Sequence, residues 1–266
     1  MYDRFNRKIN YLRISITDRC NLRCKYCMPE EGIKLLKHED ILSFEEITSF
    51  VKIAADKGID KVRITGGEPL IRKGVENLIK LISDIKEIKD ISLTTNGILL
   101  ENFAKPLAEA GLHRVNISLD TVDSNKFEEL SRGGDITKVF NGINAAKQAG
   151  LTPIKINCVV NESSEEADAV AVKAFCKTHG LEVRFIHRMS LETGKFAIVE
   201  GGTGGNCSVC NKLRLSSDGL LRPCLFNDVA FSVREFGAEK AIELALAAKP
   251  ECGTFSFKNK FNMIGG

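Results

Sequence analysis

The feature of this sequence that most constrains its fold is a repeated alternation of short β-rich runs with helical stretches. Ser43 and Glu46 have the spacing of a capping box that opens one such helix. Glycines close the stretches at Gly58, Gly111, Gly150 and Gly180. Repeats of this kind predict a parallel sheet with right-handed crossovers, and the length suits a partial (β/α)6 TIM-type barrel rather than a closed eightfold one. The predicted strands are residues 11–16, 61–65, 91–95, 114–119, 153–159 and 181–186.

The composition narrows the class of protein. Nine cysteines in a chain whose N-terminus carries no apolar signal region indicate metal binding in a reducing compartment rather than a disulfide framework. No apolar run approaches the roughly 18 residues of a membrane span. A net charge of +3 gives no reason to expect a nucleic acid. We therefore expect a cytoplasmic protein with neither a membrane nor a nucleic-acid partner.

The predicted strands alternate between apolar and polar side chains, which is unusual for a parallel sheet covered on both faces. The apolar face is expected to pack on the helices, so the polar face lines the barrel. Burying cations there without partners would be costly. We expect a lumen that holds an anionic ligand; the alternative is a structural network in which Glu182 and backbone carbonyls satisfy the charges. The cations on this face are Arg13, Arg63, Lys155 and Arg184.

A first set of three cysteines, Cys20, Cys24 and Cys27, follows the first predicted strand directly. This loop lies at the mouth of the predicted barrel, where the active sites of barrel enzymes are found. Three thiolates bind three irons of a [4Fe-4S] cluster and leave the fourth iron open. The alternative is a structural zinc site, but zinc needs four ligands and the nearest histidine is His38.

The segment 20–27, with the sequence CNLRCKYC, resembles the signature of the radical S-adenosylmethionine (SAM) superfamily. Residues 65–69, TGGEP, follow the second predicted strand and are similar to the segment of that family that contacts the SAM amino group. The resemblance implies that the open iron binds SAM and that reductive cleavage gives a 5′-deoxyadenosyl radical. The residues that it assigns to SAM are Tyr26, Gly67, Glu68, Ser118 and Met189.

A second set of three cysteines comprises Cys207, Cys210 and Cys224. Its spacing alone fits either a second cluster or a zinc knuckle completed by Cys252 or a histidine. Residues 210–226 resemble the second-cluster region of the MoaA family, the GTP 3′,8-cyclases of molybdenum cofactor biosynthesis. The resemblance implies a second [4Fe-4S] cluster whose open iron holds the substrate purine. Apart from the resemblance, Cys252 is a candidate fourth ligand of this cluster.

This resemblance extends over nearly the whole chain and implies which residues hold GTP. Most of them are the cations that strand alternation places in the lumen. A triphosphate would supply the anion that those cations need. The terminal glycines match a family tail that reaches into the active site. The implied residues are Arg13, Arg63, Thr94, Lys155, Arg184, Lys212, Arg214, Gly265 and Gly266.

The chain departs from the MoaA family in two places. The family has several dozen more residues between Met189 and Cys207, and it has arginine where this chain has Lys212. Lysine keeps the charge but loses the bidentate fork, so both departures bear on the substrate site. We expect two parts: a radical SAM partial barrel, residues 1–189, and a C-terminal region, residues 190–266, with the second cluster and the Gly-Gly tail.

The resemblance implies a lyase that converts GTP to (8S)-3′,8-cyclo-7,8-dihydroguanosine 5′-triphosphate. It implies two [4Fe-4S] clusters, SAM and a reductant protein such as flavodoxin or ferredoxin, and it is compatible with a homodimer. The first alternative is a shortened MoaA-like enzyme that acts on another small molecule or a peptide. The second is an iron–sulfur or zinc protein that stores or delivers metal.

Overall fold

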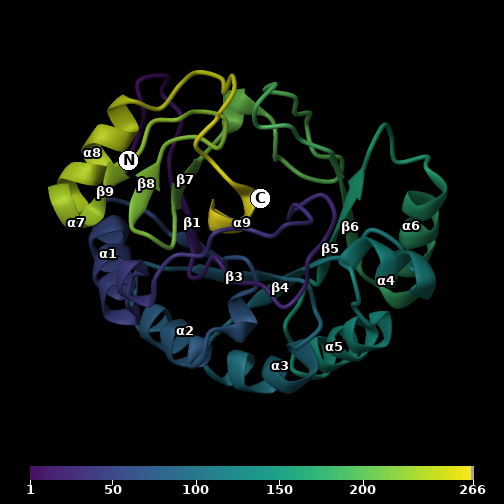
Figure 1. The fold of residues 1–266 in the computed structure, drawn as a ribbon. Coiled ribbons are helices and arrows are strands. Elements are labelled where there is room, and N and C mark those ends of the chain that lie inside the picture. The colour runs from purple at the N-terminus through teal and green to yellow at the C-terminus, as the bar shows by residue number, and fades with distance from the viewer. Residues whose placement is uncertain (265–266) are drawn as a thin grey trace.

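Six parallel strands form the main part of one curved sheet in the computed structural model, which describes residues 1–264 (Figure 1). They lie in the order β6-β5-β4-β3-β2-β1, so each strand pairs with its neighbour in sequence. This consecutive order confirms the predicted partial TIM-type barrel. The strands are β1 (Tyr11–Ser15), β2 (Lys61–Thr65), β3 (Asp90–Thr95), β4 (Arg114–Ser118), β5 (Lys155–Val160) and β6 (Glu182–His187).

Helices form an arc around the outside of this sheet (Figure 1). The capping box that the sequence predicts opens the first of them: Ser43 Oγ accepts from Glu46 N, and the Glu46 carboxylate accepts from Ser43 N. Two helices, rather than one, connect β4 to β5. No helix within residues 1–264 combines the length and the apolar character needed to cross a membrane. The helices are α1 (Phe44–Asp56), α2 (Val75–Ser83), α3 (Leu100–Glu109), α4 (Ser124–Ser131), α5 (Ile136–Gln148) and α6 (Ala167–His179), with 3-10 turns at η1 (His38–Asp40) and η2 (Pro69–Ile71).

The C-terminal part of the chain extends the same sheet. Residues 188–206 hold no helix and lead from β6 to β7 (Lys212–Leu215), which pairs in parallel with β1. Two antiparallel strands, β8 (Leu220–Arg222) and β9 (Phe231–Ser232), complete a nine-stranded sheet. The division at residue 189 stays a prediction. The remaining elements are η3 (Cys207–Val209), α7 (Val233–Phe236), α8 (Ala238–Ala247) and α9 (Phe261–Ile264).

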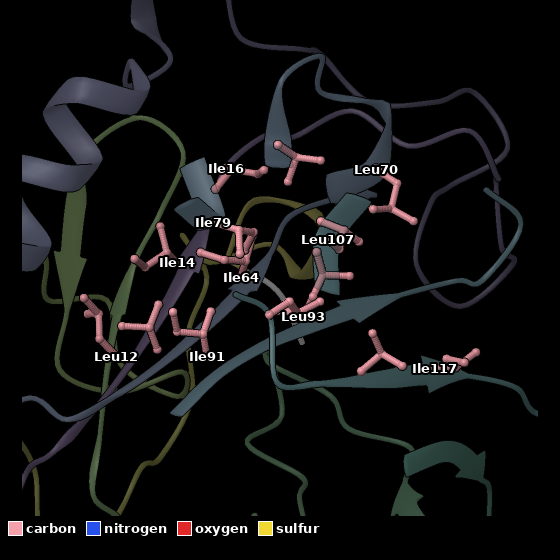
Figure 2. Close-up of a cluster of buried hydrophobic side chains, with 14 of the residues drawn as sticks. Leu12, Ile14, Ile16, Ile64, Leu70, Ile79, Ile91, Leu93, Leu107 and Ile117 are labelled. Atoms are coloured by element: carbon pink, nitrogen blue, oxygen red, sulfur yellow. The ribbon is translucent and has the colours of Figure 1, made fainter. Parts of the chain in front are cut away.

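The apolar face of the strands packs against the helices, as strand alternation predicts. Leu12, Ile64, Leu93 and Ile117 are fully buried in one continuous cluster (Figure 2). Cys176, which belongs to neither cysteine set, is buried in the same cluster. Because the apolar side chains face outward to the helices, the polar side chains of the same strands face the concave side of the sheet.

Candidate active site

The loop that carries the first three cysteines is held in place by hydrogen bonds. The N–H groups of Cys27 and Met28 donate to Cys24 O at 2.9 and 3.0 Å. Arg132 ends α4 in a left-handed conformation, and its Nη1 donates to Arg23 O and Met28 O at 2.9 Å. The end of α4 therefore fixes the shape of the cysteine loop at the mouth of the barrel.

Two glycines bring the loop after β2 against the backbone that precedes Cys20. A Cβ atom on Gly67 would lie 2.2 Å from Arg19 O, and one on Gly66 would lie 2.7 Å from Thr17 O. The Gly67 N–H donates to Thr17 O at 2.8 Å. No side chain fits at either position, so the glycines of the TGGEP segment set the distance between the cysteine loop and β2.

Glu68 joins the loops that follow β2 and β3. Its carboxylate accepts from Leu70 N at 3.0 Å, Thr95 Oγ1 at 2.8 Å and Asn96 N at 2.7 Å. Burial raises the pKa of this carboxyl to about 7, although the hydrogen bonds act to lower it. Glu68 does not line the first of the two cavities described below, so its role as a SAM contact stays a prediction. Asn96 in turn places Nδ2 3.8 Å from Cys20 Sγ.

The first three thiols lie in surroundings that oppose ionisation. Burial raises the pKa of Cys24 to about 12, with further contributions from Cys27, Cys20 and Asp120. Burial, with Cys20 and Asp120, raises the pKa of Cys27 to about 11. Such thiols become thiolates at neutral pH when a metal cation binds them. Among residues 1–264, no three His, Cys, Asp or Glu side chains converge on one ion. Three thiolates can each bind a different iron of a [4Fe-4S] cluster, which suits the chemistry of this cysteine set.

A first cavity of about 220 Å³ lies at the C-terminal ends of the strands, over the cysteine loop. It brings together the first cysteine set and most of the residues predicted to bind SAM. Thr94, predicted as a GTP contact, lines this cavity instead of the second one described below. The predicted residues that line the first cavity are Cys20, Cys24, Cys27, Tyr26, Gly67, Thr94, Ser118 and Met189.

The second three cysteines line a larger cavity of about 390 Å³. Lys249, which is 1% exposed, is in contact with one of these cysteines. Its Nζ is 3.6 Å from Cys210 Sγ and donates to Lys212 O at 2.8 Å and Pro223 O at 2.7 Å. Burial acts to raise the pKa of the Cys210 thiol, but Lys249 and Lys212 outweigh it and lower that pKa. A thiol that ionises readily beside other cysteines is suited to bind a metal.

A row of arginines, three of them buried and Arg214 partly buried, crosses four neighbouring strands on the concave side. Arg13 pairs in register with Arg63 of β2 and with Arg214 of β7, and Arg214 pairs with Arg222 of β8. Arg13 is 8% exposed and Arg63 is 9% exposed. Burial, together with Arg214 and Arg63, lowers the pKa of Arg13 well below its usual range. Like charges on adjacent strands repel, and an anion bound beside them would offset that repulsion.

The two cavities adjoin each other. Asn157, Ile186 and Met189, at the ends of β5 and β6, line both. Ligands bound in the two cavities would therefore share these three residues as a common wall. The predicted residues that line the second cavity are Arg13, Arg63, Arg184, Lys212, Arg214, Met189, Cys207, Cys210 and Cys224.

Lys155 lies apart from both cavities. It forms an ion pair with Glu182, so the structural network that the sequence left as an alternative describes this residue. Within the described part of the chain, Arg63, Arg184 and Lys212 form no ion pair with a carboxylate. These three cations line the second cavity described above. The prediction that Lys155 contacts GTP stays untested.

Tyr11 lines the second cavity, although it is not among the residues predicted for the site. The Arg63 guanidinium lies 5.4 Å and Lys212 Nζ 5.8 Å from the centre of its ring. Its buried hydroxyl has no hydrogen-bond partner among the described residues. The alternation that identifies Arg13 also places Tyr11 on the concave face, so the signal was present in the sequence.

The short segment after β6 crosses the open side of the barrel towards β7 (Figure 1). Phe185 of β6 forms an antiparallel bridge with Glu200. Phe196 stacks on Phe226, with 4.4 Å between ring centres. Residues 202–205 line the second cavity. The shortened segment therefore still reaches the second cysteine set and closes one wall of its cavity.

The end of the described chain lies inside the barrel (Figure 1). Phe261 of α9 lines the first cavity, and Ile264 is buried with Leu191 and Leu225. Gly265 and Gly266, the predicted tail, lie outside the described residues.

The fold and the two cysteine-lined cavities match a known class of enzymes. The model of the radical SAM superfamily matches residues 14–173, and the chain belongs to that superfamily. It is accordingly an enzyme that uses SAM and an iron–sulfur cluster.

Two curated relatives, both named GTP 3′,8-cyclase, indicate the family within this superfamily to which the chain belongs. The protein of Thermodesulfovibrio yellowstonii is 43% identical over 88% of this chain and 87% of its own length. The protein of Petrotoga mobilis is 39% identical over 100% of both chains. This chain belongs to the family of these proteins, the MoaA family. The Petrotoga alignment has 324 positions against 266 residues here, which agrees with a shortened chain.

Solved structures agree on the fold. The structure of SuiB from Streptococcus suis bound to the precursor peptide SuiA has a TM-score of 0.68 at 19% identity, covering 92% of this chain and 66% of that one. The structure of anSMEcpe with bound AdoMet has a TM-score of 0.55 at 23% identity, covering 70% of this chain and 51% of that one. At these identities the likeness concerns the fold alone.

Proposed function

We propose that this chain is a GTP 3′,8-cyclase, a lyase that forms a bond between ribose C3′ and guanine C8 of GTP. The product is (8S)-3′,8-cyclo-7,8-dihydroguanosine 5′-triphosphate. The observation that carries the proposal is the row Arg63, Arg13 and Arg214 in a cavity that adjoins the SAM cavity. The names of the curated relatives support it.

Both cysteine sets fit [4Fe-4S] clusters. Cys20, Cys24 and Cys27 would hold the first cluster, in a loop fixed by α4 and the TGGEP glycines. When bound, this cluster and SAM supply the 5′-deoxyadenosyl radical that removes the ribose 3′ hydrogen. Cys207, Cys210 and Cys224 would hold the second, where Lys249 favours a thiolate.

The residues of the second cavity position the substrate. In the proposal, the forked guanidinium groups of Arg63, Arg13 and Arg214 bind the triphosphate oxygens and neutralise their charge. The Nε of Arg184 is buried without a hydrogen-bond partner in the described chain, so it is also available to an anion. The common wall at Met189 would then let the ribose face the first cavity while the base lies towards the second cysteine set.

The proposal includes an external electron donor, because reductive cleavage of SAM consumes one electron. A reductant protein such as flavodoxin or ferredoxin would supply it. A cytoplasmic location agrees with nine free cysteines in the structure. The homodimer stays a prediction.

The dependence of SAM cleavage on the nucleotide tests the proposal. The anaerobically reconstituted protein is incubated with SAM and dithionite, and 5′-deoxyadenosine is measured with GTP, with ATP and without nucleotide. We expect GTP to raise the rate about tenfold or more over ATP, since polar groups left unpaired by the wrong base weaken binding. An equal rate in all three would contradict the proposal and favour another small molecule or a peptide as substrate.

A further inference from the structure

Cys252 lies within the second cysteine set, although it is distant from that set in sequence. Its Sγ is 2.8 Å from Cys207 Sγ. The next residue, Gly253, is equally close to the set: a Cβ atom there would lie 3.0 Å from Cys224 Sγ. The Cys252 side chain and the adjacent Gly253 backbone therefore each lie close to a thiol assigned to the second cluster.

A buried arginine joins the two backbone segments that carry Cys207 and Cys252. Arg7 Nη1 donates to Cys207 O and to Glu251 O, each at 2.7 Å, and Nη2 donates to Pro250 O at 2.6 Å. Asp3 holds the guanidinium from the other side, with Oδ2 2.6 Å from Nε. Both Arg7 and Asp3 are buried, so the approach of Cys252 to Cys207 is built into the fold.

The distance between the two sulfurs decides what Cys252 can do. Thiolates that bind different irons of a cubane are separated by the cluster itself, so two sulfurs 2.8 Å apart share one ligand position. The second cavity is lined by Cys207, Cys210 and Cys224 but not by Cys252, which is exposed. Cys252 is therefore placed to replace Cys207 and not to fill the iron that faces the substrate.

We propose that Cys252 is an alternative thiolate for the iron that Cys207 binds, an inference that rests on the proposed second cluster. In the exchange, the Cys252 thiol loses its proton as its sulfur binds iron, and the Cys207 thiolate takes up a proton as it leaves. No electron is transferred. The second cluster would then survive the loss of one of these two ligands, with its open iron still facing the substrate cavity.

Iron and sulfide contents of alanine variants test this inference. Each variant is reconstituted anaerobically, and alanine is used because a serine oxygen could itself bind iron. We expect C207A and C252A each to keep about eight irons, and C207A/C252A to keep about four. The matched control is C210A, whose thiol has no neighbouring substitute and which should also keep about four. Alkylation followed by mass spectrometry should find Cys252 protected in reconstituted C207A and modified in C210A.

The outcomes separate this inference from the proposed function. About eight irons in the wild type with about four in C207A, and Cys252 freely alkylated there, would overturn the role of Cys252 alone. About four irons in the wild type would overturn the second cluster and this role together. Circular dichroism and the four irons of the first cluster show that each variant has folded. If C207A does not fold, C207V, whose side chain also lacks an iron ligand, replaces it with the same readouts.

Discussion

Replacing Cys20 with alanine is expected to abolish SAM cleavage, with a loss of about 1000-fold or more in 5′-deoxyadenosine formation. Two thiolates cannot hold the three irons that anchor an open-sited cubane, so the iron content should fall from about eight to about four. The measurement is 5′-deoxyadenosine by chromatography, together with iron and sulfide analysis of the same preparation.

A matched control for this variant is Cys176→Ala. Cys176 is 1% exposed and packs in the core between helices and sheet, far from both cysteine sets in the sequence. Its truncation should lower the free energy of unfolding by about 1–2 kcal/mol through a small cavity, while the iron content and SAM cleavage are kept. Full iron content in the Cys20 variant would show that the first set does not hold a cluster.

Replacing Arg63 with methionine is expected to weaken GTP binding about 10- to 100-fold, because it removes one charged hydrogen-bond donor from the triphosphate. The same change should increase the free energy of unfolding of the ligand-free protein. It removes a buried cation that lies beside Arg13 in the row of arginines. Equilibrium dialysis with GTP measures the first effect, and urea unfolding without nucleotide measures the second.

Arg222→Met is the control for Arg63→Met. Arg222 is 6% exposed and belongs to the same row of arginines, but it does not line the second cavity. Its replacement also removes a buried cation. GTP affinity should nevertheless change by less than about twofold, because Arg222 would not contact the nucleotide directly. Equal losses in the two variants would show that the row acts through general charge and not through contact with the nucleotide.

Strand alternation predicts the face of each residue well, but it does not predict the depth along the barrel. Arg13, Arg63 and Lys155 all belong to the polar face of their strands. Lys155 begins β5, at the end away from the mouth, where Glu182 at the start of β6 neutralises it. Thr94, near the opposite end of β3, lines the first cavity instead.

The strands beyond the barrel were the main feature that the sequence analysis missed. Residues 212–215 alternate Lys-Leu-Arg-Leu, which is a strand pattern, but the run is short. Its place is decided by pairing with β1, a contact between residues some two hundred positions apart. The same long-range pairing brings Arg214 beside Arg13. In the same way, the sequence named Cys252 as a candidate ligand, but only the fold identifies Cys207 as its neighbour.

Transfer of deuterium from GTP to SAM-derived product tests the central claim most directly. The reconstituted protein is incubated with SAM, dithionite and GTP that carries deuterium at the ribose 3′ position. The proposed arrangement, with the nucleotide cavity adjoining the SAM cavity at Met189, predicts deuterium in the 5′-deoxyadenosine and a cyclised guanosine triphosphate. Formation of 5′-deoxyadenosine without deuterium, with GTP recovered unchanged, would contradict it.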